Sequence, residues 1–190
     1  MKYISIIRER LRKEPAFTRG DMKRLFPKIS SNYLNLLIHT LLKKKEIFRI
    51  SRGIYTFHDD AQVVGFGFRP FYYGCQEALS IRGIWEQETN PVIVTPRKVR
   101  AGMRHFEGGN YLVKRISRSM FFGFDLVRIG NYWVSASDLE KTLIDMVYFR
   151  QHIPREVLME MRGKLSVGKM DSYLQRCPAR VASKVRRMLE

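Results

Sequence analysis

The side chains best suited to recognition chemistry lie in residues 30–57, which read SSNYLNLLIHTLLKKKEIFRISRGIYTF. Serines at 30 and 31 can cap a helix, and the residues that follow separate into two helical faces. The apolar face consists of Leu34, Leu37, Ile38 and Leu41, and the opposite face of Asn32, Leu36, His39 and Lys43, with Asn35 on its flank. Amides can bond to adenine edges, and an apolar side chain can meet a thymine methyl. We therefore predict that Asn32, Asn35, Leu36 and His39 contact DNA bases.

The pattern after this helix changes to two β-rich runs around a glycine turn. Residues 47–50 and 54–57 flank Ser51, Arg52 and Gly53. A helix, a basic run and a hairpin in this order are typical of a winged helix-turn-helix domain. The cations expected to bind phosphate are Lys43, Lys44, Arg49 and Arg52. Arg52, at the tip of the hairpin, is placed to reach a minor groove.

Two further helices are expected before residue 30. Residues 2–13 show helical spacing of apolar side chains, and Thr18 with Asp21 forms a capping box for a second helix. Residues 1–60 thus form the predicted winged helix domain. The alternative is a small helical bundle with a solvated basic face.

Composition points to a polyanionic partner. The 190 residues include 35 Lys and Arg against 18 Asp and Glu, a formal net charge of +17. The two cysteines and four histidines show no metal-ligand spacing, so we expect no metal and no cofactor. We also expect a cytoplasmic protein that neither enters a membrane nor acts as an enzyme, because no leader, membrane span or catalytic motif is recognisable.

Residues 61–190 predict a second domain of mixed α/β type, which makes the whole chain α+β. Residues 65–70 read as a linker, 71–87 as helical, 91–95 and 111–116 as strands, and 126–134 as a hairpin turning at Gly130-Asn131. Helices are expected over 139–149, 154–162, 169–176 and 179–189.

Three charged residues near the start of the 139–149 helix resemble a nuclease set: Glu140, Lys141 and Asp145. A simpler interpretation is structural. Ser137 and Glu140 form a capping box, and Lys141 with Asp145 forms a surface ion pair.

A second basic cluster lies in this domain. Its members are Arg97, Lys98, Arg100, Arg104, Lys114, Arg115 and Arg118. If they share a face, they extend a DNA footprint or bind RNA. The alternative is a solvated loop rim.

Four segments give the chain a resemblance to the AbiEi family of antitoxins and transcriptional regulators from type IV toxin–antitoxin systems. These are RGIYTF, EALSIRG, FFG and SASDLEKTLIDM, the last matching a family pattern at Ser137, Glu140, Lys141, Leu143 and Asp145. The resemblance implies a repressor that binds inverted repeats of double-stranded DNA in its own promoter. It also implies an antitoxin that opposes a nucleotidyltransferase-like toxin without a stable complex.

One other functional class remains open from the sequence. A protein of that class binds the phosphate backbone of RNA or DNA through both basic surfaces without contacting bases. Its affinity for random duplex and for its promoter is therefore expected to be similar.

Overall fold

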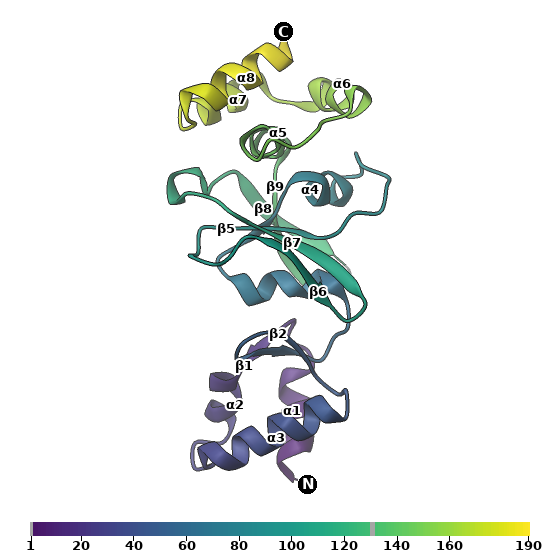
Figure 1. Cartoon of the computed structure of the whole chain (residues 1–190), viewed down its shortest axis with the longest axis vertical. Coiled ribbons are helices and arrows are strands. Elements are labelled where there is room, and N and C mark those ends of the chain that lie inside the picture. The colour runs from purple at the N-terminus through teal and green to yellow at the C-terminus, as the bar shows by residue number, and fades with distance from the viewer. Residues whose placement is uncertain (1, 130–131) are drawn as a thin grey trace. The chain divides into compact units, whose positions relative to one another are not determined.

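The computed structural model describes residues 2–129 and 132–190 and divides the chain into two compact units (Figure 1). The first unit comprises Met1–Arg69 and His105–Gly109, and the second comprises Pro70–Arg104 and Asn110–Glu190. Each unit combines helices with a β-sheet, so the chain is α+β.

The first unit contains three α-helices, a 3-10 helix and a small antiparallel sheet in its described residues. In chain order these are α1 (Lys2–Leu11), β1 (Phe17–Thr18), α2 (Arg19–Leu25), α3 (Ser31–Lys43), β2 (Phe48–Ser51), β3 (Ile54–Thr56) and the 3-10 helix η1 (Ala61–Phe68). The sheet order is β1-β3-β2. Strand β1 was not expected from the sequence, because two residues carry no detectable alternation.

The helix starts of this unit follow the predicted capping chemistry. Thr18 accepts from the backbone N–H of Asp21, whose carboxylate accepts from the N–H of Thr18 in return, which confirms the capping box. Ser30 accepts from the N–H of Tyr33 at 3.2 Å and caps α3. The expected apolar face of α3 is buried, and it joins residues of all three helices in one core: Ile7, Leu11, Phe17, Met22, Phe26, Ile29, Leu34, Leu37, Ile38, Leu41, Ile47 and Tyr55.

The expected hairpin is present as β2 and β3. Arg49 pairs with Tyr55 and Ser51 with Ile54, and Gly53 adopts a φ of +79° in the turn. Glycine adopts a left-handed φ without steric cost, which explains why glycine occupies this position of the turn. The backbone N–H of Arg19 donates to the carbonyl oxygen of Gly53 at 3.2 Å, which ties the hairpin to the start of α2.

Residues 65–70, read as a linker from their glycines, largely fold as part of η1 in the first unit. The glycines permit close packing here: a Cβ on Gly67 would lie 2.6 Å from the Cγ2 of Ile50. The first unit consequently extends to Arg69 rather than ending at residue 60.

The second unit is built on a six-stranded mixed sheet with order β6-β7-β5-β4-β9-β8, although His105–Gly109, which includes the end of β6 and the start of β7, is grouped with the first unit. Its strands are β4 (Tyr72–Tyr73), β5 (Val92–Thr95), β6 (Gly102–Phe106), β7 (Gly109–Arg115), β8 (Phe124–Ile129) and β9 (Tyr132–Ser137). Its helices are α4 (Cys75–Ile81), the 3-10 helix η2 (Arg118–Met120), α5 (Leu139–Tyr148), α6 (Arg155–Lys164), α7 (Val167–Leu174) and α8 (Ala179–Leu189). Strand β5 runs parallel to β7, and β4 runs parallel to β9.

The expected helix over 71–87 was too long. Tyr72 and Tyr73 instead form a short strand inside the sheet, where both side chains are fully buried. The predicted hairpin over 126–134 is confirmed by the β8–β9 pairing, from Phe124 opposite Ser137 to Ile129 opposite Tyr132. Its expected turn residues, Gly130 and Asn131, lie outside the described residues.

Helix α5 lies between the sheet and the C-terminal helices α7 and α8 (Figure 1). Its N-cap is Asp138, which accepts from the N–H of Lys141 at 2.8 Å, so the predicted Ser137–Glu140 capping box is wrong by one residue. Ser137 still ends β9, and the Glu140 carboxylate instead accepts from the backbone N–H of Ser166 at 2.7 Å.

Lys141 and Asp145 form an ion pair, but both side chains are fully buried, so the expected surface pair is wrong. The Tyr72 hydroxyl donates to the other carboxylate oxygen of Asp145 at 2.8 Å. Burial raises the pKa of Asp145 despite the opposing effect of Lys141, and burial beside Asp145 raises the pKa of Tyr72 well above its usual value. This cluster joins α5 to β4 in the centre of the unit.

The buried ion pair predicts a large loss of stability when one partner is removed. Replacing Lys141 by Met leaves a carboxylate buried without its cation and is expected to lower the free energy of unfolding by about 3 to 5 kcal/mol. Both tryptophans of the chain, Trp85 and Trp133, lie in the second unit, so urea unfolding followed by tryptophan fluorescence reports on this unit.

The matched control is Lys164→Met, which removes an ion pair of the same spacing whose side chains are 51% and 43% exposed. We expect that change to cost about 0.5 kcal/mol. Equal losses in the two variants would contradict a stabilising role for the buried pair.

Candidate nucleic-acid interface

The outer face of α3 is exposed and free of carboxylates. Asn32, Asn35 and His39 are exposed, and the Leu36 side chain is 56% exposed despite being aliphatic. Helix α3 contains no Asp or Glu, so this face does not repel phosphate groups. The four residues predicted to contact bases therefore share one accessible helical surface.

The predicted phosphate-binding cations lie directly after that surface in the chain. Lys43 and Lys44 are exposed where α3 ends, and Arg49 and Arg52 are exposed on the β2–β3 hairpin. The Arg49 Nε lies 3.4 Å from the carbonyl oxygen of Ser51, a long contact that leaves the guanidinium in solvent. The eight predicted residues all belong to the first unit.

Two features of this surface were missed by sequence reasoning. Arg19, the first residue of α2, donates from its Nε to the Oδ1 of Asn35 at 3.0 Å. Tyr33 is 41% exposed at the start of α3, and its ring packs edge-on against the 40% exposed Tyr3 with 5.7 Å between centroids. Tyr33 adjoins Asn32 in the sequence, so its position could have been inferred, whereas the Arg19 contact joins two helices and has no local signal.

The seven cations of the second basic cluster do not share one face. Lys114 and Arg115 are neighbours on β7, paired with Val94 and Thr95, so their side chains project from opposite faces of the sheet. Arg97, Lys98, Arg100, Arg115 and Arg118 are exposed, whereas Arg104 and Lys114 are partly buried.

The two partly buried cations have partners within the protein. Lys114 lies over the ring of Phe149, with 4.9 Å between Nζ and the ring centroid. Arg104 donates to the carbonyl oxygen of Arg100 at 2.8 Å. Arg104 also hydrogen-bonds to the Tyr111 hydroxyl and so opposes the rise in the pKa of Tyr111 that burial produces. Both cations thus have structural roles.

A charged cluster surrounds the start of α5. Asp138 accepts from the Tyr173 hydroxyl at 2.8 Å and lies 3.1 Å from the Nζ of Lys169. Lys169 also lies 3.4 Å from the carboxylate of Glu140. Burial and the Asp138 carboxylate raise the pKa of Tyr173 to about 12. These groups hold α7 to α5. The Lys141–Asp145 pair beneath them is closed to solvent, so the residues resembling a nuclease set do not form an open site.

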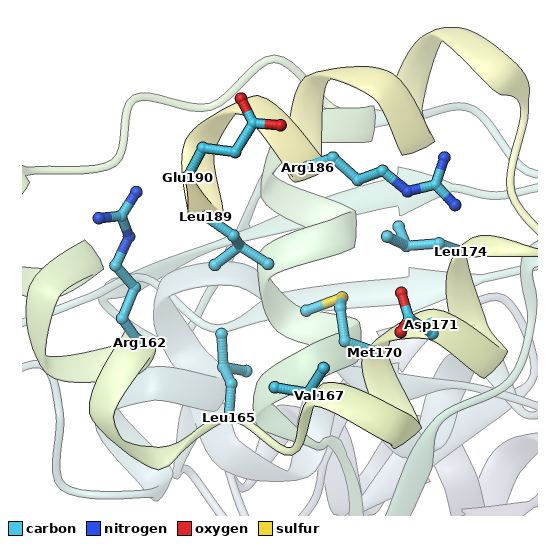
Figure 2. Close-up of a pocket in the computed structure, with 9 residues that line it drawn as sticks. All are labelled: Arg162, Leu165, Val167, Met170, Asp171, Leu174, Arg186, Leu189 and Glu190. Atoms are coloured by element: carbon cyan, nitrogen blue, oxygen red, sulfur yellow. The ribbon is translucent and has the colours of Figure 1, made fainter.

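A pocket of about 400 Å³ lies among α6, α7 and α8 (Figure 2). Its lining residues are Arg162, Leu165, Val167, Met170, Asp171, Leu174, Arg186, Leu189 and Glu190. The aliphatic side chains occupy its centre, and charged groups of α6, α7 and α8 surround them. The Arg162 Nε donates to the carbonyl oxygen of Met188 at 3.0 Å, so that guanidinium is already engaged.

Over residues 2–129 and 132–190, no cluster of three or more His, Cys, Asp or Glu is arranged to hold a metal ion. The helices in that part of the chain are all too short or too polar to cross a membrane.

Comparisons with known proteins identify the fold alone. No protein-family model matches the chain, and no curated protein matches it. Among solved structures, the RV2827C protein from Mycobacterium tuberculosis is similar, with a TM-score of 0.66 at 11% sequence identity. The match covers all of this chain and 76% of the other. The two proteins therefore share an α+β architecture.

The second basic cluster divides into exposed cations and partly buried cations, and this division predicts which of them affect polyanion binding. Replacing the exposed Lys98, Arg115 and Arg118 by Gln is expected to reduce the log–log salt slope of binding to random-sequence duplex by ~0.9 for each phosphate that the variant no longer neutralises. The slope is measured by fluorescence anisotropy at several salt concentrations.

Lys114→Gln is the internal control, because its ammonium already lies over Phe149. It is expected to leave the slope unchanged. A slope unaffected by the triple change would mean that this surface does not touch nucleic acid.

Proposed function

We propose that this protein is a sequence-specific DNA-binding repressor whose N-terminal unit is a winged helix-turn-helix domain. In this proposal α3 is the recognition helix and the β2–β3 hairpin is the wing. The observation that carries it is the outer face of α3, where Asn32, Asn35, Leu36 and His39 are exposed together on a helix without carboxylates.

The arrangement of neighbouring cations supports the same proposal. Lys43 and Lys44 end the helix, and Arg52 occupies the turn of a hairpin that Gly53 makes tight. Phosphate contacts on both sides of a helix fix its depth and register in a major groove, and amide side chains then read base edges. The net charge of +17 favours association with a polyanion.

The resemblance to the AbiEi family extends the proposal to a biological role. The protein would repress its own promoter by binding inverted repeats, and it would act as the antitoxin of a type IV toxin–antitoxin system. Its second unit would oppose a nucleotidyltransferase-like toxin without forming a stable complex.

The decisive test of DNA recognition is a gel-shift titration on the duplex immediately upstream of the gene, against a scrambled duplex of equal composition. We expect a preference of about 10³-fold for the upstream duplex. Asn32→Ala/Asn35→Ala is expected to remove most of this preference, because base contacts supply it.

Gln87→Ala/Asn90→Ala is the control, since it removes two exposed amides from the second unit. It is expected to bind as the unchanged protein does. Equal and salt-sensitive binding to both duplexes would overturn the repressor proposal and favour a backbone-binding protein that includes the second basic cluster.

The antitoxin role has a separate test. Coexpression with a nucleotidyltransferase-like toxin from the same genomic neighbourhood is expected to restore growth, and the Asn32→Ala/Asn35→Ala variant should restore it equally when both genes have foreign promoters. Failure of the unchanged protein to restore growth would contradict this role while leaving the DNA-binding proposal standing.

A further inference from the structure

The contact between Arg19 and Asn35 bears on which base the protein reads. Asn35 lies on the outer face of α3, and Arg19 opens α2, so two helices meet through this hydrogen bond. The bond uses the Nε of Arg19 and the Oδ1 of Asn35 at 3.0 Å. The Arg19 side chain therefore lies at the surface where base contacts are proposed.

The backbone of Arg19 is fixed on both sides. Thr18 before it caps α2 and pairs with Ile54 of β3, and the N–H of Arg19 donates to Gly53. The start of α2, the β1–β3 pairing and the hairpin turn therefore all constrain the backbone of Arg19. Because the backbone and the Nε of Arg19 are both held before binding, this long side chain loses little further conformational entropy when it contacts DNA.

The Nε bond determines which guanidinium groups remain available. Across the described residues, the terminal NH₂ groups of Arg19 have no hydrogen-bond partner within the protein. Two parallel donors of this kind match the O6 and N7 acceptors that guanine presents in the major groove. Adenine offers a donor at the position of O6 and would repel one of them.

We propose that Arg19, positioned by Asn35, reads a guanine in each half-site of the operator. Asn35 then acts chiefly as a positioning residue, with its Oδ1 committed to Arg19, rather than as an independent reader of adenine. This inference rests on the proposed DNA-binding function and assigns base specificity to a residue outside the recognition helix.

The test begins with the operator half-site that the unchanged full-length protein prefers, found by selection from random duplexes. At one guanine we expect replacement by adenine to weaken binding ~10- to 100-fold. Inosine keeps O6 and N7 and should bind as guanine does, whereas 7-deazaguanine lacks N7 and should bind weakly.

Two variants locate this discrimination in the Arg19–Asn35 pair. Arg19→Lys cannot form the fork and is expected to reduce the guanine-to-adenine ratio at that position to within about threefold, with other positions unchanged. Asn35→Ala is expected to reduce the same ratio, and Asn35→Asp to restore it, because a carboxylate can also accept from Nε. Arg10→Lys, on the exposed side of α1, is the control and should change nothing.

The outcomes separate this inference from the function on which it rests. A protein with no preferred duplex would overturn both. A protein that prefers a site but keeps its guanine-to-adenine ratio in Arg19→Lys would overturn only this inference. A uniform loss of affinity of Arg19→Gln on every duplex, with a salt slope lower by ~0.9, would make Arg19 a phosphate contact and would also overturn it.

Discussion

The buried contact between Lys141 and Asp145 is the interaction on which the second unit depends. A lone buried ammonium or carboxylate is strongly destabilising, so each requires the other and the hydroxyl of Tyr72 completes the set. Because Tyr72 lies in β4 and the other two in α5, one polar cluster fixes the central helix against the sheet. The aromatic ring of Phe122 adds to this, since the Lys141 Nζ lies 5.2 Å from its centroid.

Ion pairs elsewhere in the chain show which of its cations are neutralised by carboxylates. The protein's own carboxylates can neutralise at most 18 of its 35 Lys and Arg side chains, which leaves the net charge of +17. Some carboxylates join one element to another: Glu46 binds Arg8 of α1, and Asp138 binds Lys169 of α7. The α3 face and the hairpin tip receive none. Positive charge is therefore left uncompensated where nucleic acid is proposed to bind, and that surface attracts phosphate without first breaking internal ion pairs.

Features that depend on residues close together in the sequence could be predicted, and features that depend on distant segments could not. The buried face of α3, the Thr18 cap and the Gly53 turn were predictable because each depends on a few adjacent residues. The parallel pairing of β5 with β7 was not, because it joins segments with no local signal. The burial of Lys141 had no local signal: Leu143, Ile144 and Met146 form one apolar face of α5, and Lys141 lies on the opposite side, where a charged residue is expected to face solvent.

The candidate site shows the same limit at the level of one side chain. The helical spacing placed Asn35 on the flank of the outer face, yet it could not show that Arg19 of the preceding helix would bond to its amide oxygen. Base recognition and phosphate binding make different demands on a side chain. Reading a base requires donors held in place before binding, whereas phosphate contacts tolerate mobile lysines such as Lys43 and Lys44. Among the predicted DNA-contacting residues, Asn35 has its side chain fixed by another helix, which makes the Arg19–Asn35 pair the best preorganised candidate for base recognition on this surface.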